Sequence, residues 1–203
     1  MKSFKPIYLL VFLCFLGKSL LAEDSIPKRV YNTSLVNGDV PVIDGLIREQ
    51  AWNDVEWSGD FTQRSPNDGD KPTKPTAFKI LYDHNNLYVA IRAFDDEPEK
   101  IVKRMSRRDG FEGDWVEINI DSYHDQRTAF SFTASVSGVK GDEMVTNDGN
   151  NWDATWDPLW DLKTSIDDRG WVAEMRIPLT QLRFNKNRNQ VWGIQFSRRF
   201  FRN

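Results

Sequence analysis

Two tryptophans of this sequence stand among polar residues instead of in an apolar run. Trp152 and Trp156 lie within residues 147–158, a stretch rich in Asn, Asp and Gly that predicts a loop. An exposed indole packs against the apolar C–H face of a sugar ring, while neighbouring Asp and Asn side chains bond its hydroxyls. Both residues are therefore predicted to stack on carbohydrate. The residues alone leave open a second interpretation, in which the loop folds back and its indoles cover a sheet edge or a neighbouring barrel.

A third tryptophan begins an alternating segment. Trp115 shares its parity with Glu117 and Asn119, and residues of one parity lie on one face of a strand. That face is polar, whereas the residues between them are Val and Ile. We therefore predict that these three residues line a polar groove that takes part in carbohydrate binding.

Acidic side chains cluster in the second half of the chain, where Asp142, Asp153 and Asp157 are candidate metal ligands. Calcium binds six to eight oxygens, mostly from carboxylates, amides and backbone carbonyls in loops. The cluster predicts a structural calcium ion, and solvated turn residues are the alternative interpretation. The spacing differs from that of an EF-hand loop.

Side chains suited to catalysis are scarce. The two histidines, His84 and His124, fall in turn segments, and the sequence has no nucleophile-elbow motif. A glycosidase needs two carboxylates facing each other across the scissile bond, and Glu117 or Glu174 would be the candidate acid. The sequence therefore favours binding without catalysis. A glycoside hydrolase acting on O-glycosyl bonds is the third hypothesis.

Charge and the first residues limit where the protein works. With 27 Lys and Arg against 30 Asp and Glu, its pI is about 5.5, which argues against a nucleic-acid partner because a duplex binder needs a positive face. Residues 1–22 join two lysines to the apolar run Ile7–Leu16, a signal peptide pattern too short to cross a bilayer. We expect export to the periplasm, the outer membrane or the cell surface. The one cysteine, Cys14, lies inside this segment, so the mature chain relies on a packed core, a cation or a larger assembly.

Alternation of period two predicts the fold of the remainder. Residues 23–39 are polar and aperiodic, which predicts a linker, and residues 40–203 form the domain. Asp44 is predicted to cap a short helix over Gly45–Asp54. Alternating segments between turn residues predict strands at 77–82, 87–92, 116–120, 130–136, 162–166, 171–177 and 192–196. Together they predict an all-β, antiparallel, jelly-roll-like β-sandwich with one or two short helices. Four tryptophans with apolar neighbours of the same parity are predicted in its core: Trp52, Trp160, Trp171 and Trp192.

Several short motifs occur in the order in which a known family has them. They are Ile43-Asp44-Gly45 with Ala51-Trp52, Leu81-Tyr82-Asp83 with Leu87-Tyr88-Val89-Ala90, Arg107-Arg108-Asp109, Asp114-Trp115-Val116-Glu117-Ile118, Ile120-Asp121, Gly170-Trp171 with Glu174, Ile177-Pro178, Leu182-Arg183-Phe184 and Trp192-Gly193. On these motifs, residues 40–200 resemble the family 9 carbohydrate-binding module. The resemblance implies a jelly-roll-like sandwich, an oligo- or polysaccharide partner held between aromatic rings, bound calcium, and a role in carbohydrate catabolism beside glycoside hydrolases.

Two further motifs narrow the resemblance. Residues 125–130 and 197–200 are similar to a variant of the module found at the amino terminus of long secreted bacterial proteins. In that variant the module precedes a domain thought to be an outer-membrane β-barrel, so we expect the chain to be part of a longer protein with a C-terminal barrel as partner. The same resemblance supplies an alternative function, a periplasmic interaction or plug domain of such a barrel that binds no sugar.

Overall fold

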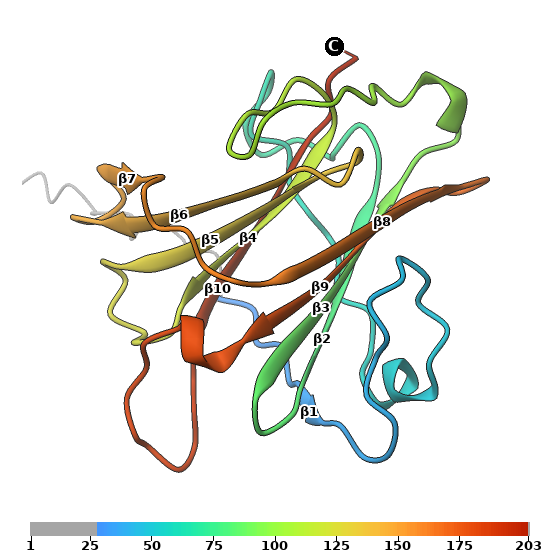
Figure 1. Cartoon of the computed structure of the whole chain (residues 1–203). Coiled ribbons are helices and arrows are strands. Elements are labelled where there is room, and N and C mark those ends of the chain that lie inside the picture. The colour runs from blue at the N-terminus through green and yellow to red at the C-terminus, as the bar shows by residue number, and fades with distance from the viewer. Residues whose placement is uncertain (1–27, 203) are drawn as a thin grey trace, which may run out of the picture. The chain divides into compact units, whose positions relative to one another are not determined.

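Two five-stranded sheets enclose an apolar core in the computed structural model, which describes residues 28–202 (Figure 1). Sheet A consists, in spatial order, of β1 (Ser34–Leu35), β2 (Thr76–Tyr82), β3 (Asn86–Phe94), β9 (Gly170–Pro178) and β8 (Asp161–Asp167). Sheet B consists of β10 (Gly193–Arg199), β4 (Trp115–Asp121), β5 (Ala129–Ser135), β6 (Lys140–Thr146) and β7 (Asn151–Asp153). Neighbouring strands are antiparallel, except that β1 runs parallel to β2. The predicted all-β sandwich is confirmed.

Alternation along the strands places the core between the sheets. Ile80 of β2 lies opposite Val89 of β3, and Ile118 of β4 lies opposite Phe132 of β5. All four are buried in one apolar cluster. Burial of each side chain of this size stabilises the fold by about 1.5–3 kcal/mol. The strand pairs therefore pack with the face that the two-residue alternation of the sequence predicts.

The four tryptophans predicted in the core differ in how deeply they are buried. Trp160 and Trp171 are buried between the sheets, and Trp52 is buried in a second cluster. Trp192 directly precedes β10 and is half-buried, with its ring 5.4 Å from that of Phe184. Three of the four are therefore buried and the fourth rests on the edge of the core.

The predicted helix over Gly45–Asp54 is wrong in its first half. Only its end is helical, as the 3₁₀ turn η1 (Gln50–Asp54). Gly45 has a φ of +87°, which ends regular helix, and its N–H donates a 2.9 Å bond to Oε2 of Glu174. Asp44 does not cap η1, because its Oδ1 accepts a bond from the N–H only two residues later. Two further 3₁₀ turns in the described residues are η2 (Pro98–Lys100) and η3 (Leu179–Gln181).

The linker predicted over residues 23–39 is part of the domain from Tyr31 onward. The hydroxyl of Tyr31 accepts a bond from the N–H of Ile80 and donates one to the carbonyl of Glu56, and β1 extends sheet A. The segment lies over the outward face of sheet A, where a second apolar cluster consists of Ala51, Trp52, Val55, Leu81, Tyr88 and Ala90. Sheet A is therefore covered on both faces, unlike an antiparallel sheet with one face in water.

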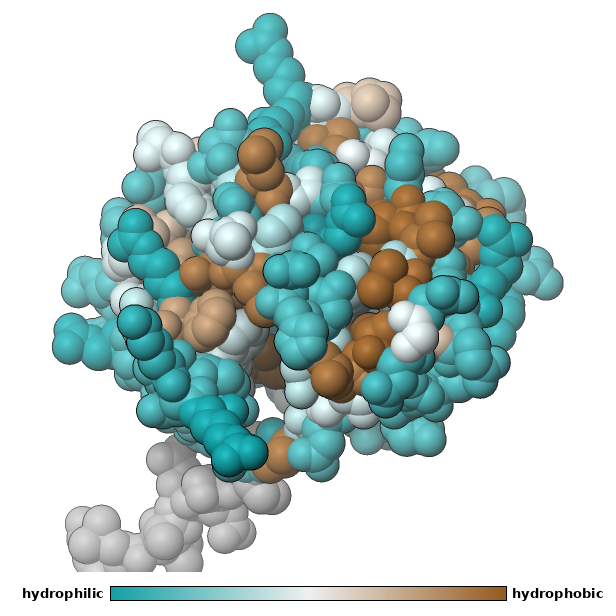
Figure 2. All heavy atoms as spheres, turned by 60° about the horizontal axis from the view of Figure 1, so that its bottom comes forward, coloured by the Kyte–Doolittle hydropathy of each residue, from teal (hydrophilic) through white to brown (hydrophobic). Residues whose placement is uncertain are grey.

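The predicted signal peptide, residues 1–22, lies outside the described residues. Among residues 28–202, no helix has the length and apolar character needed to cross a membrane. The end of the sandwich that carries the β2–β3 turn shows apolar patches separated by hydrophilic side chains (Figure 2). Exposed apolar side chains include Val40, Val42, Val191 and Ile194.

Candidate functional site

The outward face of sheet B carries polar side chains in two adjacent rows. One row crosses four strands through Gln195, Asn119, Ser131 and Glu143. The next row crosses the same strands through Ser197, Glu117, Thr133 and Gly141. We call these eight residues the polar face. The residues that alternate with these eight along the strands point into the core. The polar face therefore points away from the core.

The centre of the polar face is a hydrogen-bonded group on β4 and β5. Oε1 of Glu117 accepts bonds from Nδ2 of Asn119 and from Oγ of Ser131, both at 3.1 Å. Glu117 and Asn119 are only 9% and 8% exposed. Because Nδ2 is bound to the carboxylate, Oδ1 of Asn119 is held away from it, and this buried oxygen has no donor. A buried acceptor without a donor costs about 1–3 kcal/mol, which a donor from a ligand or a water would recover.

The polar face is acidic. Burial raises the pKa of Glu143 above its usual value, and the charges of Glu117, Asp109 and Asp142 raise it further. In the described part of the chain, neither Glu117 nor Glu143 forms an ion pair. The two carboxylates therefore give this surface a negative potential that no ion pair within residues 28–202 neutralises.

An aromatic pair borders the row of Glu117. Trp115 lies on the same face of β4 as predicted, and its ring is 6.3 Å from that of Phe111. Phe111 lies over Gly141, where an added Cβ would come within 2.3 Å of the Cζ atom of the phenyl ring. A glycine in β6 thus makes room for the ring. The sequence offered no signal for Phe111, because it lies in an irregular loop.

A second exposed ring lies at the other end of the same surface. Trp152 belongs to β7, not to a loop as predicted, and lies opposite Val145 of β6. Its indole is 46% exposed and donates from Nε1 to the carbonyl of Gly149 at 2.9 Å, which fixes the ring. Along β6, Gly141 under Phe111 and Val145 beside Trp152 are four residues apart, or about 13 Å. Glu143 lies between them.

Trp156 lies on the opposite side of sheet B. Its ring is 5.0 Å from that of Phe130 and 5.5 Å from that of Phe132, and it packs on the core between the sheets. Trp152 and Trp156 therefore do not form the paired platform that the sequence suggested. For Trp156 the structure favours the second interpretation, in which the segment folds back onto the sheet.

The three candidate calcium ligands do not converge. Asp142 and Asp157 each pair with Nη2 of Arg108 at 2.6 Å, while Asp153 accepts bonds from the N–H and hydroxyl of Thr155. The guanidinium supplies the positive charge that a cation would bring. Within residues 28–202, no three His, Cys, Asp or Glu side chains gather as a metal site. These residues do not fit the calcium site predicted for them.

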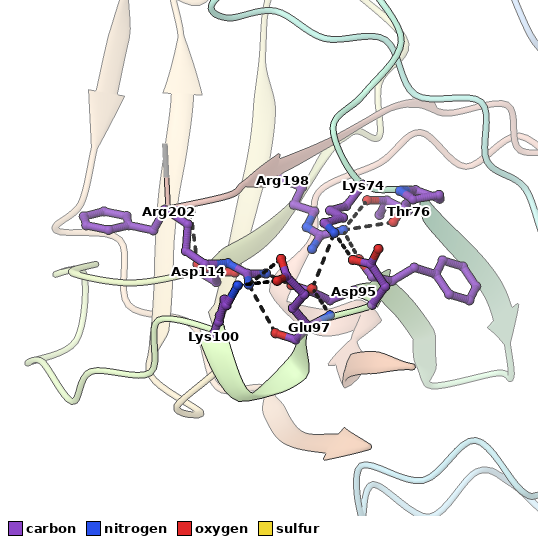
Figure 3. A network of polar contacts seen from close by, with 12 residues as sticks. Lys74, Thr76, Asp95, Glu97, Lys100, Asp114, Arg198 and Arg202 are labelled. Carbon is purple, nitrogen blue, oxygen red and sulfur yellow. Dashed lines mark hydrogen bonds and ion pairs between the residues drawn. The ribbon is translucent and has the colours of Figure 1, made fainter. Parts of the chain in front are cut away.

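Buried charges fix the start of β4, where the polar face begins (Figure 3). Asp114, directly before β4, accepts a 3.1 Å bond from the N–H of Phe201. Arg198 of β10 donates at 2.9 and 3.0 Å to a backbone carbonyl directly before β2 and to one at the end of β3, and Arg202 pairs with buried Asp95. Burial raises the pKa of Asp114 and lowers that of Arg198 to about 10. The network ties one end of the antiparallel β4–β10 pair, where β4 starts and β10 finishes, to sheet A.

A β-sandwich with one covered sheet and one polar, aromatic-bordered sheet face has the layout of a ligand-binding module. Residues 43–198 match the family model described as carbohydrate family 9 binding domain-like, and the chain belongs to that family. None of the curated proteins matches the sequence.

Solved structures of one module have the same fold. The chain is similar to a family 9 carbohydrate binding module from Caldicellulosiruptor kristjanssonii in complex with glucose, at 22% identity and a TM-score of 0.55, over 81% of this chain and 76% of that one. The same module in complex with cellotriose gives 23% identity and a TM-score of 0.54, over 81% and 75% of the two chains.

Proposed function

We propose that the domain is a non-catalytic carbohydrate-binding module whose ligand lies on the polar face. The observation that carries the proposal is the Oδ1 atom of Asn119, a buried acceptor that faces outward and lacks a donor. A sugar hydroxyl supplies such a donor. Beside it, Trp152 and the pair of Phe111 and Trp115 offer apolar rings on which pyranose C–H faces pack.

The spacing of the rings favours a short oligosaccharide. The two positions of β6 beside Phe111 and Trp152 are about 13 Å apart, which exceeds one pyranose ring and suits two or three linked sugars. Family membership and the glucose and cellotriose complexes of the similar module support a neutral β-linked glucan as the first ligand to test.

The cellular setting belongs to the same proposal. The signal pattern of residues 1–22 supports an exported protein, and the family supports a role in carbohydrate catabolism next to glycoside hydrolases. The outer-membrane barrel partner rests on residues 125–130 and 197–200 alone.

The test is calorimetric titration with cello-oligosaccharides of two to four units. We expect Trp152→Ala and Asn119→Ala each to weaken binding about tenfold or more, because each removes a contact worth more than 1.4 kcal/mol. Trp57→Ala is the matched control, since that indole is 43% exposed but lies away from the polar face, near Lys79 of sheet A.

Two results would contradict the proposal. One is undiminished binding by both Trp152→Ala and Asn119→Ala. The other is the absence of heat with a broad set of oligosaccharides, which would favour the alternative of a domain that docks on a barrel and binds no sugar.

A further inference from the structure

The polar face has more hydrogen-bond acceptors than donors. Oε1 of Glu117 already accepts two bonds, Oδ1 of Asn119 accepts none, and Glu143 stands in the row of Asn119 with no cation partner in the described chain. A ligand that completes this group must bring N–H or O–H donors. Its binding free energy is more favourable if it also brings positive charge, because Glu117 and Glu143 lie in adjacent rows of the same face and the charge of Glu117 acts on Glu143.

No Lys or Arg of residues 28–202 forms an ion pair with Glu117 or Glu143. By register Arg199 shares this sheet face and lies opposite Trp115, two residues along the strands from the row of Glu117 and four residues, or about 13 Å, from the row of Asn119 and Glu143. Its guanidinium lies over the ring of Phe201 instead. Its distance from the row of Glu143 exceeds the screening length of physiological salt, about 8 Å, and Arg199 forms no ion pair with Glu117.

The cation three residues before Glu143 and the cation that pairs with the neighbouring Asp142 are also committed elsewhere. Lys140 donates to the carbonyl of Trp160, and Arg108 pairs with Asp142 and Asp157. The negative potential of the polar face is therefore a property of the folded protein, and the raised pKa of Glu143 is consistent with it.

We propose that the polar face selects carbohydrates bearing a protonated amine, such as β-linked glucosamine oligomers, over neutral and acidic sugars. This inference rests on the proposed function and names the ligand class of the same site. An ammonium group carries three N–H donors and a positive charge, so it can donate to Oδ1 of Asn119 while the negative charges of Glu117 and Glu143 on the same face attract it. A hydroxyl brings one donor and no charge, and a uronate brings a second negative charge.

The test compares four tetrasaccharides by calorimetry on the same protein. They are the β1,4-glucosamine tetramer, its fully N-acetylated form, cellotetraose and tetragalacturonate, measured at a pH where the amine is protonated and carboxylates are ionised. The first two share the sugar backbone and its linkage, and the N-acetyl groups of the second remove the positive charge. We expect the glucosamine tetramer to bind at least about fivefold more tightly than the N-acetylated form, a ratio that falls with added salt, and tetragalacturonate to bind weakest.

Two variants locate the origin of the preference. Glu143→Gln is expected to bring the ratio of the two affinities toward one. Glu99→Gln is the matched control, because Glu99 is an exposed glutamate in η2 and its replacement changes the net charge of −3 equally. The ratio should survive in this control.

The outcomes separate the two proposals. Binding of neutral tetrasaccharides with a ratio near one in the unmodified protein overturns the amine preference and leaves carbohydrate binding standing. A ratio that persists in Glu143→Gln also overturns it, since the attraction then comes from overall charge. No binding of any of the four overturns both.

Discussion

The buried carboxyl group of Glu174 makes the stability of the domain depend on pH. Glu174 is fully buried beneath the Asp44–Gly45 turn, and its Oε2 accepts the two N–H groups of that turn at 3.1 and 2.9 Å. Burial outweighs these two bonds and, together with the charges of Glu49 and Asp44, raises the pKa from 4.5 to about 7. The folded protein therefore holds this proton more tightly than the unfolded chain does.

The sign and size of the effect follow from the two pKa values. Below pH 4.5 the group is protonated in both states and its contribution is complete. Between pH 4.5 and about 7 the unfolded chain releases the proton first, so the free energy of unfolding falls as the pH rises. Each pH unit of difference between the pKa values is worth about 1.4 kcal/mol, which gives a loss of about 3 kcal/mol by pH 7 and little further change above it.

The assay is urea denaturation of the unmodified protein and of Glu174→Gln at several pH values. Gln keeps an acceptor for the turn and does not titrate, so the difference in unfolding free energy between the two proteins isolates this group. We expect that difference to shift against the unmodified protein by about 3 kcal/mol between pH 4.5 and 7. A difference that stays constant, or that shifts in favour of the unmodified protein, would refute the reasoning. A constant difference would show that the two N–H groups offset the effect of burial on the carboxylate, and a shift in favour of the unmodified protein would show that they outweigh it.

Two further predictions concern residues whose roles the structure separates. Trp156→Ala should lower the unfolding free energy by about 3 kcal/mol, because that ring packs on the core, whereas Trp152→Ala should cost less than about 1 kcal/mol. Equal losses in urea denaturation would contradict this division. Arg108→Ala should cost about 3 kcal/mol because it leaves the buried carboxylate of Asp142 without its counter-charge. Arg127→Ala removes an exposed ion pair and should lower the unfolding free energy by less than about 1 kcal/mol. Thermal melts of both variants with and without calcium test whether the ion can take the place of the Arg108 guanidinium beside Asp142.

Much of the fold could be predicted because most strands alternate clearly. Parity alone placed Trp171 in the core and Glu117 with Asn119 on an outward face, and the structure agrees. The segment that became β6 was not recognised as a strand, because Lys, Gly, Asp and Glu at its start have low strand propensity. Once β6 is known, the alternation of side chains places Asp142 on the core side of the sheet and Glu143 on the polar face.

The division of the two loop tryptophans could not be predicted in the same way. Composition identifies residues 147–158 as polar, but which side of the sheet an indole reaches depends on the short strand β7 and on the turn after it. The contact of Trp156 with Phe130 and Phe132 joins residues that are far apart in the sequence. Long-range packing of this kind leaves no local pattern. The role of Phe111 was missed for the same reason.

The most direct measurement for carbohydrate binding on the polar face is an NMR titration with cellotetraose. The side-chain amide of Asn119 and the indole N–H of Trp152 both report from this surface, while the indole N–H of Trp171 lies in the core and serves as the internal control. We expect the first two signals to shift along one binding curve with a single Kd, and the Trp171 signal to stay in place. Saturable shifts confined to other parts of the domain, with Asn119 and Trp152 unmoved, would contradict binding on the polar face.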